Sequence, residues 1–326
     1  MLRSLFDFLS KQHWAQRLIT RWGFAWRLAS RFVAGETLEE AMQAVEGLAR
    51  DGINASLDHL GEHTTSLEEA RQAVSEILRI LNEIQRRGLP ANVSIKLSQI
   101  GALLDSEECY QNLVTILENA RARDNFVRVD MEDSHLTQLT LDLFLRALAD
   151  GYDNAGIVLQ SYLYRTDADL ERVMAQGARV RMVKGAYLEP RSLAYPSKKE
   201  VNAAFDRQVE RLLGATQKAG CPALSSDGRV PPVLAVASHD PKRVEFARQT
   251  AARLEIPAEA LEFQMLYGIR RDLQQQLAKD GYPVRVYVPF GTRWYPYLMR
   301  RLGERPANLW FTLSNFFRKC AKPHVH

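Results

Sequence analysis

Short runs rich in β-branched and apolar residues alternate with longer helical patterns along most of the chain. The runs are residues 53–60, 92–97, 126–131, 156–161, 180–184, 232–238, 261–267 and 284–288. The helical patterns between them are residues 66–88, 107–123, 135–150, 167–177, 199–220, 241–254 and 269–281, and several end in glycine, a common helix terminator. Eight such runs predict parallel strands joined by right-handed crossovers and closed into a (β/α)8 barrel.

An open, doubly wound sheet is the structural alternative for a chain that alternates strands and helices. Such sheets usually carry a glycine-rich phosphate-binding turn after the first strand, and neither that pattern nor a P-loop occurs here. A chain of 326 residues, 46% hydrophobic and 25% charged, suits one large barrel. We therefore predict a helical arm at residues 1–50, the barrel at 51–320 and a tail at 321–326.

Composition and charge exclude several classes of protein. The net charge of +4 comes from 43 Lys and Arg residues spread among 39 Asp and Glu residues, which argues against a nucleic-acid-binding surface. No apolar run approaches the roughly 20 residues that span a bilayer, and the first residues lack a signal-peptide pattern. The three cysteines are far apart and predict neither a disulfide framework nor a metal site, which favours a cytoplasmic protein.

The first 34 residues are basic and aromatic, with six lysines and arginines against a single acid, Asp7. Phenylalanines and tryptophans are interleaved with these bases. One interpretation is an amphipathic arm on the inner face of a membrane, which would suit an enzyme that passes electrons to a lipid-soluble acceptor. The other is a helix packed on the barrel, because charge and periodicity alone do not separate the two.

Ionic side chains occur within the predicted strands, where they are costly unless they are paired or contact a ligand. Alternation along the strands turns Lys96 and Asp130 toward the barrel interior, near the carboxyl ends of neighbouring strands, where barrel active sites lie. Ser94, Ser98, Arg128 and Glu132 share these inner faces. A buried ion pair between the two strands is the alternative. A functional site is favoured because more polar residues converge on the same ends, namely Gln160, Arg181, Lys184, Ser238, His239, Arg285 and Tyr287.

A helical segment after the last strand carries two adjacent arginines. Positions three and four apart share a helix face, so Tyr297 lies beside Arg300 and Arg301, and Glu304 lies beside both arginines. Two arginines facing a pocket would clamp a small carboxylate through charge-assisted hydrogen bonds. A solvated, charged helix face is the alternative.

Eight motifs, taken in order, resemble the proline dehydrogenase family. They are Asn92-Val-Ser-Ile-Lys-Leu-Ser, Val127-Arg-Val-Asp-Met-Glu, Leu159-Gln-Ser-Tyr, Val180-Arg-Met-Val-Lys-Gly-Ala-Tyr, Ala237-Ser-His, Glu262-Phe-Gln-Met-Leu-Tyr-Gly, Tyr287-Val-Pro-Phe-Gly and Tyr297-Leu-Met-Arg-Arg. Each lies at the barrel element that the family pattern requires, and the resemblance extends over residues 53–308. It implies a distorted TIM-type barrel with FAD bound non-covalently at the carboxyl ends of the strands, oxidising L-proline to 1-pyrroline-5-carboxylate.

The resemblance also implies roles for individual residues. The implied catalytic residues are Lys96, Asp130, Arg181 and Tyr287. The implied proline contacts are Lys96, Arg300 and Arg301 to the carboxylate, Tyr187, Leu266, Tyr287 and Tyr297 around the ring, and Glu62, which would pair with Arg300. The implied FAD contacts are Asp130, Gln160, Arg181, Val183, Gly185, Ala186, Ser238, His239 and Glu304, with Lys198 or Lys199 at the phosphates. Arg181 would stabilise negative charge on the reduced flavin.

The compact spacing between Tyr287 and Tyr297 resembles the single-function bacterial branch of the family. Membership of this branch implies a separate pyrroline-5-carboxylate dehydrogenase as the downstream enzyme, which forms glutamate. The resemblance to the family also implies a quinone as electron acceptor.

Two other functions remain open. A barrel lyase or aldolase could use Lys96 or Lys184 as a Schiff-base amine, because desolvated strand lysines suit that role. A non-catalytic flavoprotein or membrane-bound interaction module, with the basic arm as its working part, is the second alternative.

Overall fold

Eight parallel strands close into one barrel in chain order in the computed structural model, which describes residue 9, residue 12 and residues 23–304. The strands are β1 (Asn54–His59), β2 (Ala91–Ile95), β3 (Val127–Val129), β4 (Ala155–Gln160), β5 (Arg179–Val183), β6 (Leu234–Ala237), β7 (Leu261–Leu266) and β8 (Val284–Phe290). Every predicted run therefore overlaps a strand, and β8 pairs with β1 to close the ring. The predicted barrel is confirmed, and the open sheet is excluded.

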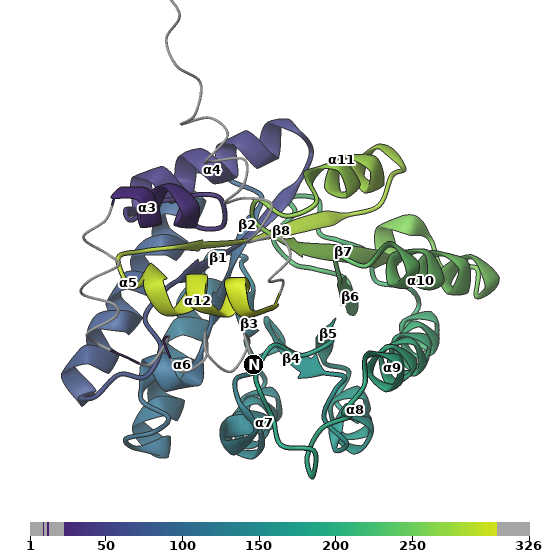
Figure 1. The fold of residues 1–326 in the computed structure, drawn as a ribbon, viewed down its shortest axis with the longest axis horizontal. Helices are drawn as coiled ribbons and strands as arrows, with labels where there is room; N and C mark the ends of the chain where they lie inside the picture. Colours follow the sequence, from purple (N-terminus) through teal and green to yellow (C-terminus); the bar gives the residue numbers. More distant parts are fainter. Residues whose placement is uncertain (1–8, 10–11, 13–22, 305–326) are drawn as a thin grey trace, which may run out of the picture. The chain divides into compact units, whose positions relative to one another are not determined.

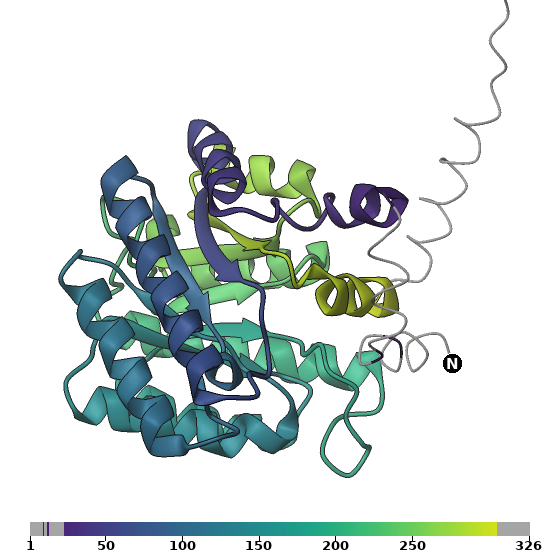
Figure 2. The ribbon, with the colours of Figure 1, turned by 90° about the vertical axis from the view of Figure 1, so that its left-hand side faces the viewer.

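One helix follows each of the first seven strands and returns along the outside of the barrel (Figure 1). These helices are α5 (Leu67–Arg87), α6 (Ser106–Arg121), α7 (Ser134–Ala149), α8 (Thr166–Ala175), α9 (Lys198–Lys218), α10 (Pro241–Arg253) and α11 (Arg271–Lys279). Two short 3-10 turns, η1 (Leu97–Ile100) and η2 (Ala258–Ala260), lie between them. Figure 2 shows from the side that the helices run alongside the sheet.

Local sequence signals explain where these helices begin and end. The Ser66 side chain accepts a hydrogen bond from the Glu69 backbone at the start of α5, and Gly88 ends that helix in the left-handed conformation with φ of 61°. Helix α9 begins with a capping box, in which Ser197 and Glu200 bond each other's backbone N–H.

Helix α4 (Leu38–Arg50) completes the outer ring by packing against β1 and β8, a place that no crossover helix fills. Its buried side chains Ala41, Met42 and Val45 join the apolar layer between the helices and the strands. The segment before it is anchored to the end of β8, because Ala34 N–H donates to Pro289 and Gly291 N–H donates to Gly35.

The barrel wall has an apolar outer side and a polar inner side. Leu57, Val93, Val129 and Phe263 are fully buried or nearly so in the layer beneath the helices. The alternate positions carry polar residues that are also buried, namely Asn54, Ser56, Asp58, Asn92, Ser94, Lys96, Arg128, Asp130, Arg181, Glu262, Gln264 and Arg285. An interior this polar is costly unless its members bond one another or a ligand.

The barrel lies within a compact unit that spans Val33–Thr292. A second unit comprises the two ends of the chain, and its described helices are α3 (Gly23–Ala29) and α12 (Trp294–Glu304). Within it the rings of Trp26 and Trp294 lie 5.5 Å apart. Most of the basic arm and the predicted tail lie outside the described residues, so the membrane interpretation and the domain boundaries stay predictions.

Candidate active site

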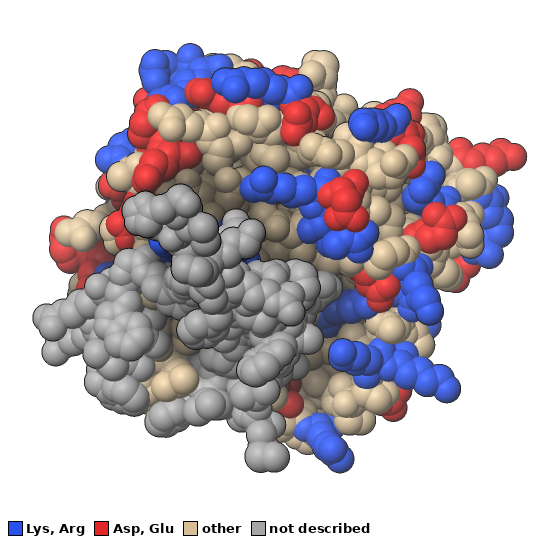
Figure 3. Space-filling model, turned by 45° about the horizontal axis from the view of Figure 1, so that its top comes forward, with Lys and Arg blue, Asp and Glu red and all other residues tan. Residues whose placement is uncertain are grey.

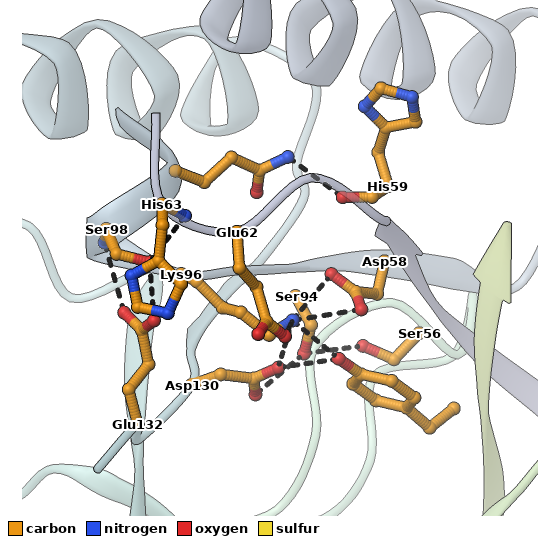
Figure 4. A network of polar contacts seen from close by, with 12 residues as sticks. Ser56, Asp58, His59, Glu62, His63, Ser94, Lys96, Ser98, Asp130 and Glu132 are labelled. Carbon is orange, nitrogen blue, oxygen red and sulfur yellow. Dashed lines mark hydrogen bonds and ion pairs between the residues drawn. The ribbon is translucent and has the colours of Figure 1, made fainter. Parts of the chain in front are cut away.

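Lys96 lies at the centre of a buried network at the carboxyl ends of the strands (Figure 4). Its ammonium nitrogen is 2.9 and 3.0 Å from the two carboxylate oxygens of Asp58 on β1. It also donates to the Tyr287 hydroxyl of β8, at 3.2 Å. Carboxylate oxygens of Asp130 and Glu62 lie 3.8 Å from the same nitrogen. The structure thus brings together four residues that the sequence predicted, and adds Asp58.

Arg181 of β5 joins the same network through Asp130. Its Nη1 lies 2.8 Å from Asp130 Oδ1, and its Nη2 donates to Ser94 at 3.1 Å and to Ser56 at 3.4 Å. The Tyr287 hydroxyl donates to the other oxygen of Asp130, at 2.8 Å. Asp130 therefore links the two cations, and five strands contribute to one connected cluster.

Burial and neighbouring charges set the protonation states in this cluster. Burial lowers the pKa of Lys96, but Asp58, Asp130 and Glu62 outweigh it, so the pKa of Lys96 lies above its ordinary value. Burial, followed by the charges of Asp130 and Asp58, raises the pKa of Tyr287 well above its ordinary value. Lys96 is therefore a permanent ammonium, and Tyr287 is a neutral hydroxyl that both accepts and donates.

Arg181 has one buried donor that no group in the described part of the chain accepts from. Its Nε has no hydrogen-bond partner among the described residues, although the side chain is only 6% exposed. An unsatisfied buried N–H of this kind is costly, so a ligand that accepts its hydrogen bond would be stabilised here. A cationic donor in this place fits an anionic or electron-rich cofactor atom, as the predicted FAD contact requires.

A second buried carboxylate, Glu132, lies beside this cluster at the end of β3 (Figure 4). It accepts hydrogen bonds from the backbone N–H of Ser98, at 3.0 Å, and from the Ser98 hydroxyl, at 2.5 Å. Burial raises the pKa of Glu132 despite these hydrogen bonds. Gln160, a predicted FAD contact, donates its amide to the Glu132 carbonyl at 2.8 Å.

The other predicted FAD contacts in the barrel lie at the ends of β5 and β6, in the loop that follows β5 and in the first turn of α9. Val183 is the last residue of β5, and Ser238 directly follows β6. Leu266, a predicted contact to the proline ring, is the last residue of β7. His239 accepts the Leu266 N–H on its Nε2 at 3.0 Å. The remaining positions are Gly185, Ala186 and Tyr187 in the loop, and the exposed Lys198 and Lys199 in the first turn of α9.

The loop between β5 and α9 projects from the barrel (Figure 2) and begins with a constrained glycine. Gly185 has φ of 111°, and a Cβ on it would lie 2.3 Å from the ring of Tyr162. Only glycine fits both requirements, so the local chain path at this predicted FAD contact depends on it.

The predicted arginine clamp lies on α12, in the second unit. The Arg301 guanidinium lies over the Tyr297 ring, 5.2 Å from its centroid, as the helical spacing predicted. The Glu304 side chain lies outside the described residues. The predicted meeting of Arg300 and Arg301 with Lys96 stays a prediction.

The sequence analysis did not identify Asp58 as a site residue, and it placed Arg285 at the wrong end of the barrel. Asp58 shares the alternation that revealed Lys96, because the polar residues 54, 56 and 58 follow the apolar residues 53, 55 and 57 in turn, and this signal could have identified it. The prediction that Arg285 joins the carboxyl ends of the strands is wrong. Its guanidinium bonds Glu262 at 3.0 Å and the carbonyl of Gly228, which lies in the loop that enters β6 at the opposite end of the barrel.

On the face that Figure 3 shows, basic and acidic side chains are interspersed rather than gathered by sign. Ion pairs between outer helices, such as Arg253 with Glu210 and Arg146 with Glu107, likewise join exposed charges of opposite sign. None of the helices within the described part of the chain has the length and apolar character needed to cross a bilayer.

Comparison with known proteins identifies the family. A family model described as proline dehydrogenase matches residues 41–313. Proline dehydrogenase 1 of Bacillus subtilis is 38% identical over 320 residues, which cover 98% of this chain and 100% of that protein. Proline dehydrogenase of Deinococcus radiodurans is 39% identical over 297 residues, covering 90% of this chain and 91% of the relative.

A crystal structure of proline utilization A from Bdellovibrio bacteriovorus, inactivated by N-propargylglycine, matches the fold with a TM-score of 0.78 and 24% identity. The match covers 86% of this chain and 33% of that one, so the chain spans about a third of the larger protein. The family model matches most of the chain, and the two relatives are 38% and 39% identical to it over at least 90% of its length. The chain therefore belongs to the proline dehydrogenase family, whose members are oxidoreductases.

Proposed function

We propose that this protein oxidises L-proline to 1-pyrroline-5-carboxylate with FAD bound at the carboxyl ends of the strands. The observation that carries the proposal is the Lys96 ammonium in the barrel centre, next to Arg181 with its unused Nε. The first is a donor for an amino-acid carboxylate, and the second is a donor for the cofactor. FAD, when bound, supplies the acceptor for the hydride of the proline ring.

The residues of the chain would then position the substrate and manage its charge. Lys96 would bind the carboxylate, together with Arg300 and Arg301 as the family resemblance implies. A carboxylate held in this way would orient the ring carbon next to nitrogen for loss of its hydride. Formation of the C=N bond also requires the ring nitrogen to lose a proton. The cations around the carboxylate favour that loss, because they destabilise a second positive charge nearby. Arg181 would stabilise the negative charge that arrives with the electrons.

The structure weakens the lyase or aldolase alternative. A Schiff-base lysine must be an unprotonated amine, whereas the pKa of Lys96 is raised by three carboxylates. The other candidate, Lys184, is ion-paired with Asp240 at 2.8 Å.

We further propose that the electrons pass to a quinone and that a separate pyrroline-5-carboxylate dehydrogenase consumes the product. Peripheral contact with a membrane through the basic arm would bring the two electron carriers together. These partners are supported by the family assignment alone.

The test is proline-dependent bleaching of the flavin absorbance of the purified protein. We expect Arg300→Ala and Arg301→Ala to keep their flavin and to need at least about tenfold more proline, as for the loss of a charge-assisted hydrogen bond. The exposed Arg50 on α4 offers a matched control, and Arg50→Ala should behave as the unaltered protein. A protein that is colourless, or whose flavin proline does not bleach, would refute the proposed function. Unchanged proline dependence in both arginine variants would refute the clamp.

A further inference from the structure

Asp58 is the nearest carboxylate to Lys96, yet it has no place in the predicted set of proline and FAD contacts. Its side chain is 1% exposed, and both of its oxygens lie within 3.0 Å of the Lys96 nitrogen. Figure 4 shows the two side chains facing each other from β1 and β2. A carboxylate buried this deeply, where burial raises its pKa, is costly unless it has a specific use.

The geometry determines how Lys96 distributes its three N–H groups. Two N–H groups of one ammonium diverge too widely to point at both oxygens of a single carboxylate, so one N–H serves Asp58. The Tyr287 hydroxyl, at 3.2 Å, accepts a second. The oxygens of Asp130 and Glu62, at 3.8 Å, are beyond hydrogen-bonding distance. One N–H of Lys96 is therefore left for a ligand.

Tyr287 alone would hold Lys96 poorly, because its hydroxyl is a neutral acceptor that is already committed to Asp130 at 2.8 Å. A lysine side chain has four flexible bonds and much rotamer freedom to lose. Asp58 is the charged group close enough to restrict that freedom. Without it, the ammonium would be free to turn toward Asp130 and Glu62.

We propose that Asp58 is a positioning residue, which holds the Lys96 ammonium so that its remaining N–H is presented to the carboxylate of the bound amino acid. This inference rests on the proposed function, because it requires a substrate carboxylate at Lys96. It adds a residue from β1 to the substrate site, although Asp58 does not itself touch the substrate.

Loss of Asp58 should affect proline binding more than the chemical step. A contact to the carboxylate is made in the ground state and in the transition state alike, so its loss raises KM more than it lowers kcat. For Asp58→Ala we expect KM for proline to rise at least about tenfold and kcat to fall by about threefold or less. Asp58→Asn keeps one acceptor oxygen and nearly the same volume, so its KM should lie between those of Asp58→Ala and the unaltered protein.

A double-mutant cycle with Lys96→Ala tests whether Asp58 acts through Lys96. We expect Lys96→Ala to raise KM, and the Asp58→Asn change to add nothing in that background. Competitive inhibition by cyclopentanecarboxylate, a ring carboxylate without the amine, should weaken in Asp58→Asn as much as proline binding does. Asp169→Asn is the matched control, because Asp169 is a buried carboxylate paired with Arg165 at 2.6 Å on α8, outside the barrel.

The outcomes are distinguishable. If proline does not bleach the flavin of the unaltered protein, the proposed function fails and this inference fails with it. If the unaltered protein is active but Asp58→Asn keeps its KM, the positioning role alone is refuted. The same holds if Asp58→Asn raises KM as much in the Lys96→Ala background as in the unaltered one. Equal losses in Asp58→Asn and Asp169→Asn would show a general effect of instability and would also overturn it.

Discussion

The ion pair between Glu262 and Arg285 joins the neighbouring strands β7 and β8 inside the barrel, and removing one partner should destabilise the fold strongly. The two side chains are 0% and 1% exposed. Arg285 contacts both oxygens of Glu262 at 3.0 to 3.1 Å and donates to the carbonyls of Ala55 and Gly228, each at 2.8 Å. Among the described residues, Glu262 is the carboxylate that forms an ion pair with this guanidinium. Glu262→Gln removes the negative charge and leaves the guanidinium with neutral acceptors.

We expect Glu262→Gln to lower the free energy of unfolding by about 3–5 kcal/mol, the cost of an uncompensated buried charge. Most of this cost comes from the charge that remains, so the double variant Glu262→Leu with Arg285→Met should recover much of the loss. Urea unfolding followed by far-UV circular dichroism measures the difference through the shift of the midpoint.

The matched control is Asp142→Asn, which breaks the half-exposed pair between Asp142 and Arg172, at 3.3 Å. Exposed pairs contribute little, so this change should cost less than about 1 kcal/mol. A loss below about 1 kcal/mol for Glu262→Gln, or a double variant less stable than the single one, would refute the reasoning.

Two more predictions concern Glu132 and Gly185. Burial raises the pKa of Glu132, so the folded protein holds this proton more tightly than the unfolded chain does. The free energy of unfolding should therefore fall as the pH rises above the ordinary value of 4.5, by at most about 1.4 kcal/mol per pH unit. Glu132→Gln mimics the protonated form, so the variant should lack this part of the decline. Urea unfolding at several pH values between 4.5 and 7 measures it. If stability falls with pH equally in the variant and the unaltered protein, the raised pKa of Glu132 is refuted. Given the proposed FAD site, Gly185→Ala should lower the content of bound flavin and cost about 1–3 kcal/mol of stability, because Gly185 has φ of 111° and an added Cβ would meet the Tyr162 ring. Flavin absorbance per mole of protein and thermal unfolding measure the two effects. Gly214→Ala is the control, because a Cβ at that helical position would meet no atom within 4 Å. Equal flavin content in the two variants would refute the role of Gly185.

The strands and helices of the barrel could be predicted because their signals are local. A buried strand is marked in the sequence by a short apolar run. The ends of a helix are marked by capping residues, such as Ser66 and Gly88 at α5. The period of two along a strand also identified which side chains face inward. Lys96, Asp130 and Arg181 were predicted in this way, and the structure joins them in one network.

The partners of these side chains could not be predicted. Alternation shows which residues face inward, but it does not show which residues of different strands lie at the same level along the barrel axis. Arg285 and Tyr287 both face inward on β8, yet only Tyr287 reaches Lys96, whereas Arg285 bonds a loop at the opposite end. The register that pairs Asn54 with Arg285 and Ser56 with Tyr287 depends on hydrogen bonds between the first and last strands.

The pairing of Asp58 with Lys96 has the same origin. The two residues are 38 positions apart, and neither strand contains a signal for the other. They meet because the stagger of a closed sheet sets which inner positions share a level, and that stagger is a property of the whole ring of strands. Local pattern thus decided which side chains turn inward, and closure of the barrel decided which of them touch.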